Sequence, residues 1–274
     1  MNNAQTYANE WCSYPLSIAD QQEHIQHYER LFDEIQPGDP ALLYWSLAQR
    51  HGLVLGISQK PESLNQEALR ERDLPVYRRR AGGTTVLVGP GLLCLDVILP
   101  AGHPLITTDI VESYRWFGEA WVETLRVLGI ETRTISAEEA HSERARLKQA
   151  ETHAYEALMN RSCYGTLSPY EVVVGKRKVV GLCMVRRRQG SLLQAGIVLD
   201  WESDLLAHVL GQTAQEQELL RSGLPERAIG LNRLSATPPG INAIIHAFEE
   251  VVAMFTHVSI ERATTTSETM GQSN

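Results

Sequence analysis

The sequence lacks most features that mark specialised classes of protein. It has no run of 18 apolar residues, and its first residues lack the basic and then apolar pattern of a secretory signal, so we expect neither membrane insertion nor export. Its four cysteines include no CxxC pair and are too few for a disulfide scaffold, which predicts free thiols. No HExxH motif or other cluster with metal-ligand spacing occurs, so no metal site is predicted. We therefore predict a cytoplasmic protein.

Composition and charge further limit the class of protein. Hydrophobic residues make up 43% and charged residues 21% of the 274 residues, which is typical of a folded globular domain. The formal net charge of −8 argues against sequence-independent binding to the phosphates of a nucleic acid. No internal repeat and no long linker divides the sequence. We expect one domain with no nucleic-acid partner and no membrane partner.

Apolar spacing predicts helices around a sheet. Helices are expected over residues 20–37, 109–128, 203–223 with a weak point at Gly211, and from 241 onward after two prolines. Short apolar runs predict strands over residues 41–48, 52–57, 74–80, 84–91 and 92–100, and a hairpin followed by a third strand over 171–200. No element is assigned to the polar and charged stretch at 136–161. Because the strands cluster instead of alternating regularly with helices, the fold class is predicted to be α+β.

Three arginines and two glycines follow one predicted strand. Arg78, Arg79 and Arg80 stand before Gly82 and Gly83. Paired glycines let the backbone approach a ligand closely, and exposed N–H groups beside guanidinium groups favour an anion. The segment is not a P-loop, because no GK[ST] follows it. An ordinary hairpin turn with solvated charges is the alternative interpretation, and the segment alone leaves it open.

A cysteine and a lysine are predicted to lie close together. Cys163 stands in a loop before the predicted hairpin, and Lys178 lies just beyond the turn that reverses the first strand. An ammonium group near a thiol favours the thiolate, which acyl transfer through cysteine requires. The alternative is that Cys163 is a small buried hydrophobe. Cys94 and Cys183 lie within apolar strands and are expected to pack in the core.

In this order, the segments resemble the lipoate-protein ligase and octanoyltransferase family, whose catalytic domain is shared with biotin protein ligases. The resemblance covers residues 40–234. Residues 78–83 stand where the family has RRxSGG, and GLVLGISQKPESLN, with Gly56 and Gln59, resembles the strand before it. SPYEVVVGKRKVVGL resembles the lysine hairpin of the family and places Lys178 at its site lysine, and LLQAGIVLD resembles the next strand.

The resemblance implies a single biotin/lipoate-ligase-like domain with a mixed β-sheet packed with helices. It places this catalytic domain at residues 39–262. Residues 1–38 would then form an N-terminal extension with an amphipathic helix, and residues 263–274 a flexible tail.

Two departures distinguish the chain within that family. The ligases usually show GGGxVxHDxGN, where this chain has Thr84, Val88, Gly89 and Leu92 at the third glycine, histidine, aspartate and asparagine positions. This weakens the case for nucleotide-dependent activation. SCYGTLSPYE, in contrast, resembles the cysteine loop of bacterial octanoyltransferases and amidotransferases that form a thioester, which implies that Cys163 is the nucleophile.

The resemblance therefore implies an acyltransferase of protein lipoylation. Its catalytic residues would be Cys163 and Lys178, and its substrate-binding residues Arg78, Arg79, Gly82, Gly83 and Thr84. The octanoyl donor would be acyl carrier protein or an octanoyl-lysine on a glycine-cleavage H-type carrier protein, and the acceptor a lipoyl domain of a 2-oxoacid dehydrogenase. No cofactor is implied, because the acyl group arrives activated. An ATP-dependent lipoate-protein ligase and a non-catalytic carrier-binding member of the same fold remain alternatives.

Overall fold

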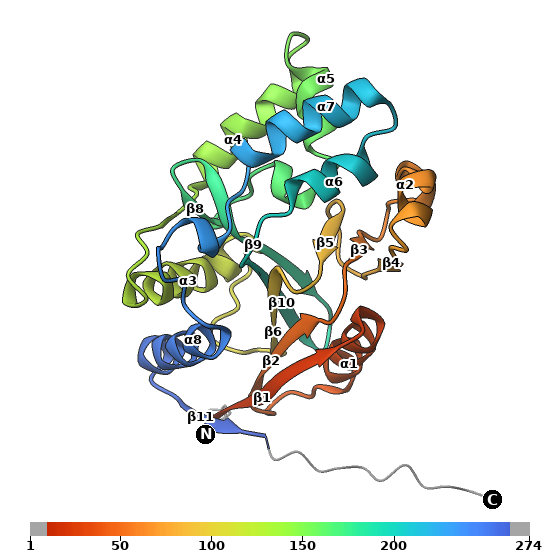
Figure 1. The fold of residues 1–274 in the computed structure, drawn as a ribbon. Coiled ribbons are helices and arrows are strands. Elements are labelled where there is room, and N and C mark those ends of the chain that lie inside the picture. The colour runs from red at the N-terminus through yellow and green to blue at the C-terminus, as the bar shows by residue number, and fades with distance from the viewer. Residues whose placement is uncertain (1–9, 264–274) are drawn as a thin grey trace, which may run out of the picture.

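The computed structural model describes residues 10–263 and contains two β-sheets (Figure 1). The strands are β1 (Glu10–Ala19), β2 (Ala41–Ala48), β3 (Gly52–Leu55), β4 (Val76–Arg78), β5 (Val86–Val88), β6 (Leu92–Pro100), β7 (Arg133–Thr134), β8 (Val172–Val174), β9 (Arg177–Arg186), β10 (Gly190–Val198) and β11 (Ser259–Arg262). The main sheet has eight strands in the order β11-β1-β2-β6-β10-β9-β8-β7, and the smaller sheet has the order β4-β3-β5. β1 pairs in parallel with β2 and β11, whereas β2, β6, β10 and β9 are antiparallel neighbours, so the main sheet is mixed.

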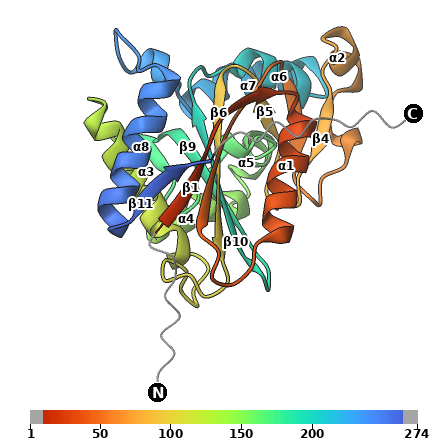
Figure 2. The ribbon, with the colours of Figure 1, turned by 90° about the horizontal axis from the view of Figure 1, so that it is seen from below.

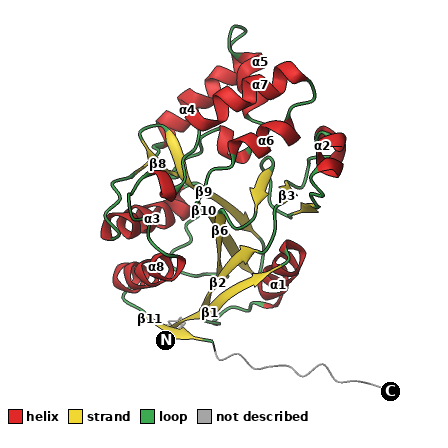
Figure 3. Ribbon diagram, viewed as in Figure 1, coloured by secondary structure: helices red, strands yellow, loops and turns green. Residues whose placement is uncertain are grey.

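Helices cover both faces of the main sheet. They are α1 (Gln21–Glu34), α2 (Gln66–Glu71), α3 (Arg115–Val127), α4 (Ala137–Ala145), α5 (His153–Met159), α6 (Ser203–Leu210), α7 (Ala214–Gly223) and α8 (Ile241–Thr256). Figure 2 shows α3 and α8 on one side of the sheet and α1 on the other. α4 to α7 gather at one end of the molecule (Figure 3). The fold is thus α+β, with a mixed sheet packed with helices.

The face of the main sheet toward α3 and α8 is closed by aromatic side chains. Trp45 of β2 meets Trp121 of α3 and Phe248 of α8 in edge-to-face contacts, with ring centroids 6.1 and 5.6 Å apart. Trp121 and Phe248 lie 4.4 Å apart, and all three side chains are fully buried. Aromatic pairs of this kind add to the free energy that burial of apolar area already supplies.

Several predicted elements are confirmed. β2 and β6 have the bounds that the apolar runs gave, and the hairpin of β8 and β9 turns at Gly175, whose φ of +63° suits glycine. α1 begins after Asp20, whose side chain accepts a hydrogen bond from the Gln22 N–H. The predicted helix over 203–223 is two helices, because the first ends at Gly211.

The strand β1 was not predicted, and its sequence shows why. Pro15 interrupts the segment, which argues against an internal strand. In the structure the pairing of β1 with β2 shifts register between Tyr14 and Ser17. This irregularity lets a residue without an N–H group stand within the sheet.

Two helical boundaries also differ from expectation. α3 begins at Arg115 instead of near residue 109, because a 3₁₀ turn at Glu112–Tyr114 precedes it and the Asp109 carboxylate accepts from the Val111 and Glu112 N–H groups. The polar stretch at 136–161 contains α4 and α5. The signal for α4 was present, since Ser136 and Glu139 form a capping box.

The three-part division of the chain remains a prediction. Within residues 1–38, β1 pairs with β2 of the main sheet and α1 packs on it. Of the predicted flexible tail, residues 264–274 lie outside the described residues.

Candidate active site

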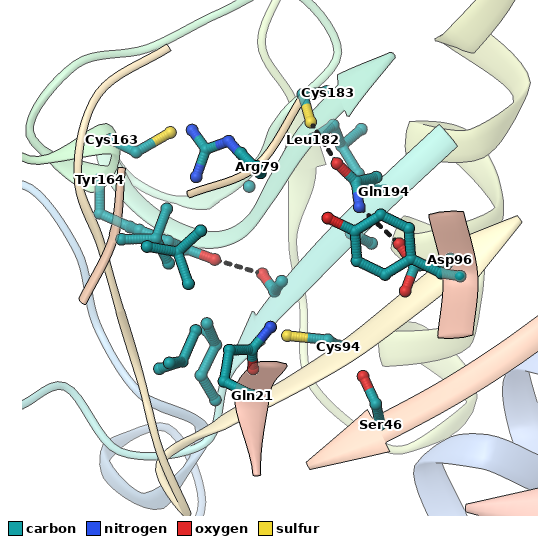
Figure 4. A pocket seen from close by; sticks show the side chains of 18 residues that line it. Gln21, Ser46, Arg79, Cys94, Asp96, Cys163, Tyr164, Leu182, Cys183 and Gln194 are labelled. Atoms are coloured by element: carbon teal, nitrogen blue, oxygen red, sulfur yellow. Dashed lines mark hydrogen bonds between the residues drawn. The ribbon is translucent and has the colours of Figure 1, made fainter. Parts of the chain in front are cut away.

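A pocket lies between the main sheet, the start of α1 and the segment that joins β4 to β5 (Figure 4). Strands β2, β6, β9 and β10 contribute lining residues on one side, and Arg79, Val86 and Val88 contribute on the other. Cys163 lies at the wall of this pocket. Figure 4 shows its thiol pointing toward the guanidinium group of Arg79.

The backbone of Cys163 is held on both sides. Its N–H donates to the Thr85 carbonyl oxygen at 2.8 Å, and its own carbonyl oxygen accepts from Lys178 Nζ at 2.9 Å. The 3₁₀ turn Cys163–Gly165 is packed closely, because a Cβ at Gly165 would lie 1.9 Å from the Met159 carbonyl oxygen. Both backbone polar groups are therefore paired, and the thiol is the group left to react.

Tyr164 fixes the Cys163 turn onto the sheet. Its ring lies over Gly181 of β9 and Gly196 of β10, and its hydroxyl donates to the Gly196 carbonyl oxygen at 2.6 Å. A Cβ at Gly196 would lie 2.4 Å from the Tyr164 hydroxyl oxygen, and one at Gly181 would lie 3.1 Å from the ring. Both positions must therefore lack a side chain for the ring to fit.

Lys178 forms a buried ion pair with Glu171. Lys178 Nζ lies 2.7 Å from the Glu171 carboxylate, and the two side chains are 1% and 2% exposed. The carboxylate also accepts from the N–H groups of Ser168 and Leu182. Burial raises the pKa of the Glu171 carboxyl, and the nearby Lys178 ammonium opposes that rise. A buried pair is stable only when its remaining polar atoms are hydrogen-bonded, as they are here.

The hairpin brings Lys178 to Cys163 as the sequence predicted, but the contact differs from the expected one. The ammonium bonds to the Cys163 carbonyl oxygen and to Glu171, and no hydrogen bond joins it to the thiol in the described part of the chain. Glu171 was not predicted as a site residue. A signal was available, because Glu171 is the only acidic residue in SPYEVVVGKRKVVGLCMVR and a lysine within an apolar hairpin needs a carboxylate partner.

Arg79 is the cation that lines the pocket. It is 8% exposed, and its Nε and Nη2 groups donate to the carbonyl oxygens of Gly82 and Thr84 at 3.0 to 3.3 Å. Nη1 donates to no group within residues 10–263. A Cβ at Gly83, whose φ is +93°, would lie 3.0 Å from Nη2 and 4.0 Å from Cys163 Sγ. A buried guanidinium with a free donor beside a thiol can stabilise an anion there.

The other predicted binding residues lie at different distances from the pocket. Gly82, Gly83 and Thr84 form the turn that Arg79 holds, and their N–H groups have no acceptor among the described residues. Arg78 is exposed, donates to the Ile57 carbonyl oxygen at 3.0 Å and does not line the pocket. The structure therefore places Arg79 and the glycine turn beside Cys163 and leaves Arg78 outside.

Cys94 and Cys183 line the pocket, and Cys94 also packs against a buried apolar cluster, so the expectation of core packing holds in part for Cys94. Leu93 and Leu95 beside Cys94 and Leu182 beside Cys183 are buried, but the cysteine side chains themselves face the cavity. Burial raises the pKa of both thiols to about 12, which keeps them protonated near neutral pH. They are therefore poor nucleophiles.

The positions that depart from the ligase pattern give the pocket apolar walls. Val88 and Leu92 are buried and line the cavity. Gly89 packs against His51, and a Cβ there would lie 2.4 Å from the imidazole ring. These side chains offer no polar contact to a nucleotide.

Neither a metal cluster nor a membrane-spanning helix is found within residues 10–263. No group of three His, Cys, Asp or Glu side chains there could hold a metal ion. No helix within these residues has the length and apolar character needed to cross a membrane.

Comparison with known proteins agrees with this geometry. Residues 20–253 match the family model described as the lipoyl protein ligase A/B catalytic domain. Octanoyltransferase LipM of Lysinibacillus sphaericus is 28% identical over 212 residues, which cover 77% of this chain and 73% of the relative. Octanoyltransferase LipM of an Exiguobacterium species is 29% identical over 212 residues, or 77% of this chain and 72% of the relative.

The fold is also found in solved structures. A bipartite lipoate protein ligase of Thermoplasma acidophilum superposes with a TM-score of 0.74 at 17% identity, covering 95% of this chain and 88% of the other. LipL1 of P. falciparum superposes with a TM-score of 0.62 at 12% identity, covering 92% and 65%. At such identities the likeness shows the fold alone. The sequence match over residues 20–253 goes further, and the chain belongs to the lipoyl protein ligase A/B catalytic domain family.

Proposed function

We propose that the protein is an octanoyltransferase that moves an octanoyl group, through a thioester on Cys163, to a lysine of a lipoyl domain. The observation that carries this proposal is the position of the Cys163 thiol, which faces a pocket and points toward the guanidinium group of a buried arginine, Arg79. The relatives named octanoyltransferase LipM support the same reaction. They are similar to this chain over about three quarters of its length.

The first step would transfer the acyl group from a carrier thioester to Cys163. The thiolate sulfur attacks the carbonyl carbon, and the carbonyl oxygen becomes an oxyanion. Arg79 Nη1 and the unpaired N–H groups of Gly82, Gly83 and Thr84 are the donors available to that oxyanion. When the intermediate collapses, the C–S bond to the carrier breaks, and the carrier sulfur leaves with the proton that Cys163 gave up.

The second step would transfer the acyl group to the acceptor. The ε-amine of a lipoyl-domain lysine attacks the Cys163 thioester and loses a proton, the C–S bond breaks, and the Cys163 thiol is restored. The product is an amide, which is more stable than the thioester. With an octanoyl-lysine donor on a glycine-cleavage H-type protein, the first step breaks an amide and must be drawn forward by the second.

Lys178 would act on Cys163 through the backbone. Its ammonium holds the Cys163 carbonyl oxygen, and Glu171 holds the ammonium. Lys178 therefore positions the turn that presents the thiol, and Glu171 positions Lys178. Proton transfer by Lys178 itself would be a second role, and substitutions at residues 171 and 178 distinguish the two roles.

Activation by ATP is the main alternative, because lipoate-protein ligases share the fold. Val88 and Leu92 favour the transferase, since they line the pocket with apolar side chains where the ligases have polar ones. A donor that arrives as a thioester on acyl carrier protein needs no such activation.

The test is a reconstituted transfer with apo lipoyl domain as acceptor. Octanoyl acyl carrier protein and octanoylated H-type protein serve as donors in parallel, without ATP, and mass spectrometry measures the modified acceptor. We expect modification with at least one donor. Free octanoate with ATP and magnesium should give none. Efficient modification from free octanoate would show a ligase, and binding of a carrier with no transfer would show a non-catalytic member.

A further inference from the structure

The wall of the pocket formed by the main sheet carries a polar row. Side chains at alternate positions of a strand share a face. Asp96 of β6 stands opposite Gln194 of β10, and Gln194 stands opposite Cys183 of β9. Gln194 Nε2 donates to the Asp96 carboxyl at 2.5 Å, and the Cys183 thiol donates to Gln194 Oε1 at 3.5 Å. Three neighbouring strands thus form a hydrogen-bonded chain along one wall.

Two polar side chains at the far end of the same pocket have no hydrogen-bond partner among residues 10–263. Gln21, the first residue of α1, is 8% exposed, and Ser46 of β2 is 2% exposed. Both line the cavity, and no hydrogen bond joins either side chain to another group in the part of the chain that the structure describes. Figure 4 shows both well away from Cys163, beside Cys94. Ser46 stands opposite Cys94 on β6, and Cys94 stands opposite Gly196, which holds Tyr164.

This arrangement places the unpaired groups where the end of an acyl chain would lie. Ser46 is two strands away from Gly196 in the main sheet, which is about 10 Å at the usual strand spacing. An acyl chain on Cys163 that runs along this wall would bring its last carbons to Gln21 and Ser46. A wholly apolar chain would exclude water from both groups without giving either a partner, which is unfavourable.

We propose that the pocket accepts an acyl chain with a hydroxyl group at its far end, as well as the unsubstituted octanoyl chain. Gln21 and Ser46 would pair with that hydroxyl group. A hydroxyl can donate to the amide oxygen and accept from the serine hydroxyl, so both groups gain a partner at once. The acylation test of this proposal rests on the proposed function, because it needs Cys163 to react. The binding test depends only on the pocket.

The acylation test compares two N-acetylcysteamine thioesters, octanoyl and 8-hydroxyoctanoyl, as donors to Cys163. In each reaction the Cys163 sulfur displaces N-acetylcysteamine, which leaves with the thiol proton, and intact mass measures the adduct. We expect the hydroxylated thioester to react at least as fast as the octanoyl thioester. In an apolar pocket the hydroxyl group would instead slow the reaction by about tenfold or more.

A matched pair of variants on α1 makes the test specific. Gln21→Leu removes the unpaired amide, and Gln22→Leu makes the same change at the next residue, whose side chain is exposed. We expect Gln21→Leu to lower the ratio of hydroxyoctanoyl to octanoyl rates by about three- to tenfold, the worth of one hydrogen bond. Gln22→Leu should leave the ratio unchanged. A ratio well below one in the native protein, or one that Gln21→Leu does not change, would overturn the proposal.

Binding to the Cys163→Ala protein separates this inference from the proposed function. Calorimetry would compare octanoate with 8-hydroxyoctanoate, which needs no chemistry at residue 163. If neither thioester acylates the native protein but hydroxyoctanoate binds at least as tightly as octanoate and depends on Gln21, the proposed function fails and the pocket inference stands. Weaker binding of hydroxyoctanoate would overturn the inference, whatever the fate of acylation.

Discussion

The two faces of the main sheet are built from the same strands, but the face toward α3 and α8 is an apolar core, whereas the face toward α1 combines a buried apolar cluster with polar residues that line the pocket. Adjacent residues turn to opposite sides. Leu95 and Leu193 face the apolar core against α3 and α8, whereas Asp96 and Gln194 face the pocket. Leu182 packs with that core while Cys183 beside it bonds to Gln194. Both faces therefore bury apolar side chains, and only the face toward α1 also carries the polar residues that line the pocket of Cys163.

This difference shows which residues of a sheet with both faces covered can form a functional site. An apolar run predicts that a strand is buried, but not which of its residues face a cavity. The single polar residue within each run is the better signal, because a buried polar side chain needs a partner or a ligand. Asp96 in LLCLDVILP and Gln194 in LLQAGIV are such residues.

The largest combined loss of stability and activity is expected from breaking the buried ion pair of Lys178 and Glu171, which has no counterpart in the aromatic core. Lys178→Met leaves the Glu171 carboxyl buried without its partner and should lower the free energy of unfolding by about 3–5 kcal/mol. It should also slow acyl transfer, because the Cys163 carbonyl oxygen loses its donor. Urea unfolding and the transfer assay measure the two effects.

A double variant separates positioning by Lys178 from chemistry by Lys178. Lys178→Met with Glu171→Leu replaces both charges by apolar side chains and should restore much of the stability. If it also restores transfer, Lys178 only supports the fold. Lys178→Arg keeps a charge but no readily titrated amine, so a folded variant that is alkylated at Cys163 by iodoacetamide at the native rate, yet transfers slowly, would indicate proton transfer by Lys178.

A cavity in the apolar face should affect stability and leave the pocket intact. Trp45→Ala removes a ring that contacts Trp121 and Phe248 and should lower the free energy of unfolding by about 3–5 kcal/mol. Ser46→Ala, one residue further along β2, removes an unpaired hydroxyl and should change stability by less than about 1 kcal/mol. Equal losses in urea unfolding would contradict the distinction between the faces.

Because Asp96 in the polar row can ionise, the stability of the protein should depend on pH, which the apolar core against α3 and α8 cannot cause. Burial raises the pKa of Asp96 from 3.8 to about 7, so folding favours its neutral form, and this contribution to stability is lost as pH rises through about 7. Asp96→Asn removes the titration. Its stability relative to the native protein should therefore rise between about pH 4 and 7, by up to about 4 kcal/mol above pH 7.

The control for this titration is Asp204→Asn, because the Asp204 side chain is 85% exposed. Thermal unfolding at a series of pH values measures both variants. A pH-independent difference between Asp96→Asn and the native protein would show that Asp96 ionises as an ordinary exposed carboxyl group.

A smaller loss of stability is expected at Tyr164, where the 3₁₀ turn Cys163–Gly165 packs on the main sheet. Tyr164→Phe keeps the ring over Gly181 and Gly196 but removes the hydrogen bond to the Gly196 carbonyl oxygen. Stability should fall by about 1 kcal/mol. Urea unfolding should show this loss while acylation of Cys163 continues. Abolished acylation would mean that the hydroxyl has a chemical role.

Much of the fold could be predicted from the sequence, because its strands are continuous apolar runs bounded by turn residues. The approach of Lys178 to Cys163 also followed from the hairpin at Gly175. The pairing of Glu171 with Lys178 within this hairpin could have been predicted in the same way, because the two residues are close in sequence. The pairing of Asp96 with Gln194 could not, because it depends on the register between strands that are far apart in sequence, and no local pattern specifies it.

The central claim is that Cys163 is the residue that holds the acyl group, and one experiment tests it most directly. The protein is incubated with octanoyl acyl carrier protein or octanoylated H-type protein and no acceptor, and its intact mass is measured. We predict one octanoyl group with at least one donor. The adduct should be absent from Cys163→Ala and retained by Cys183→Ala, whose missing thiol has a pKa raised to about 12 by burial. An adduct that persists in Cys163→Ala, or none on the native protein with either donor, would contradict the account.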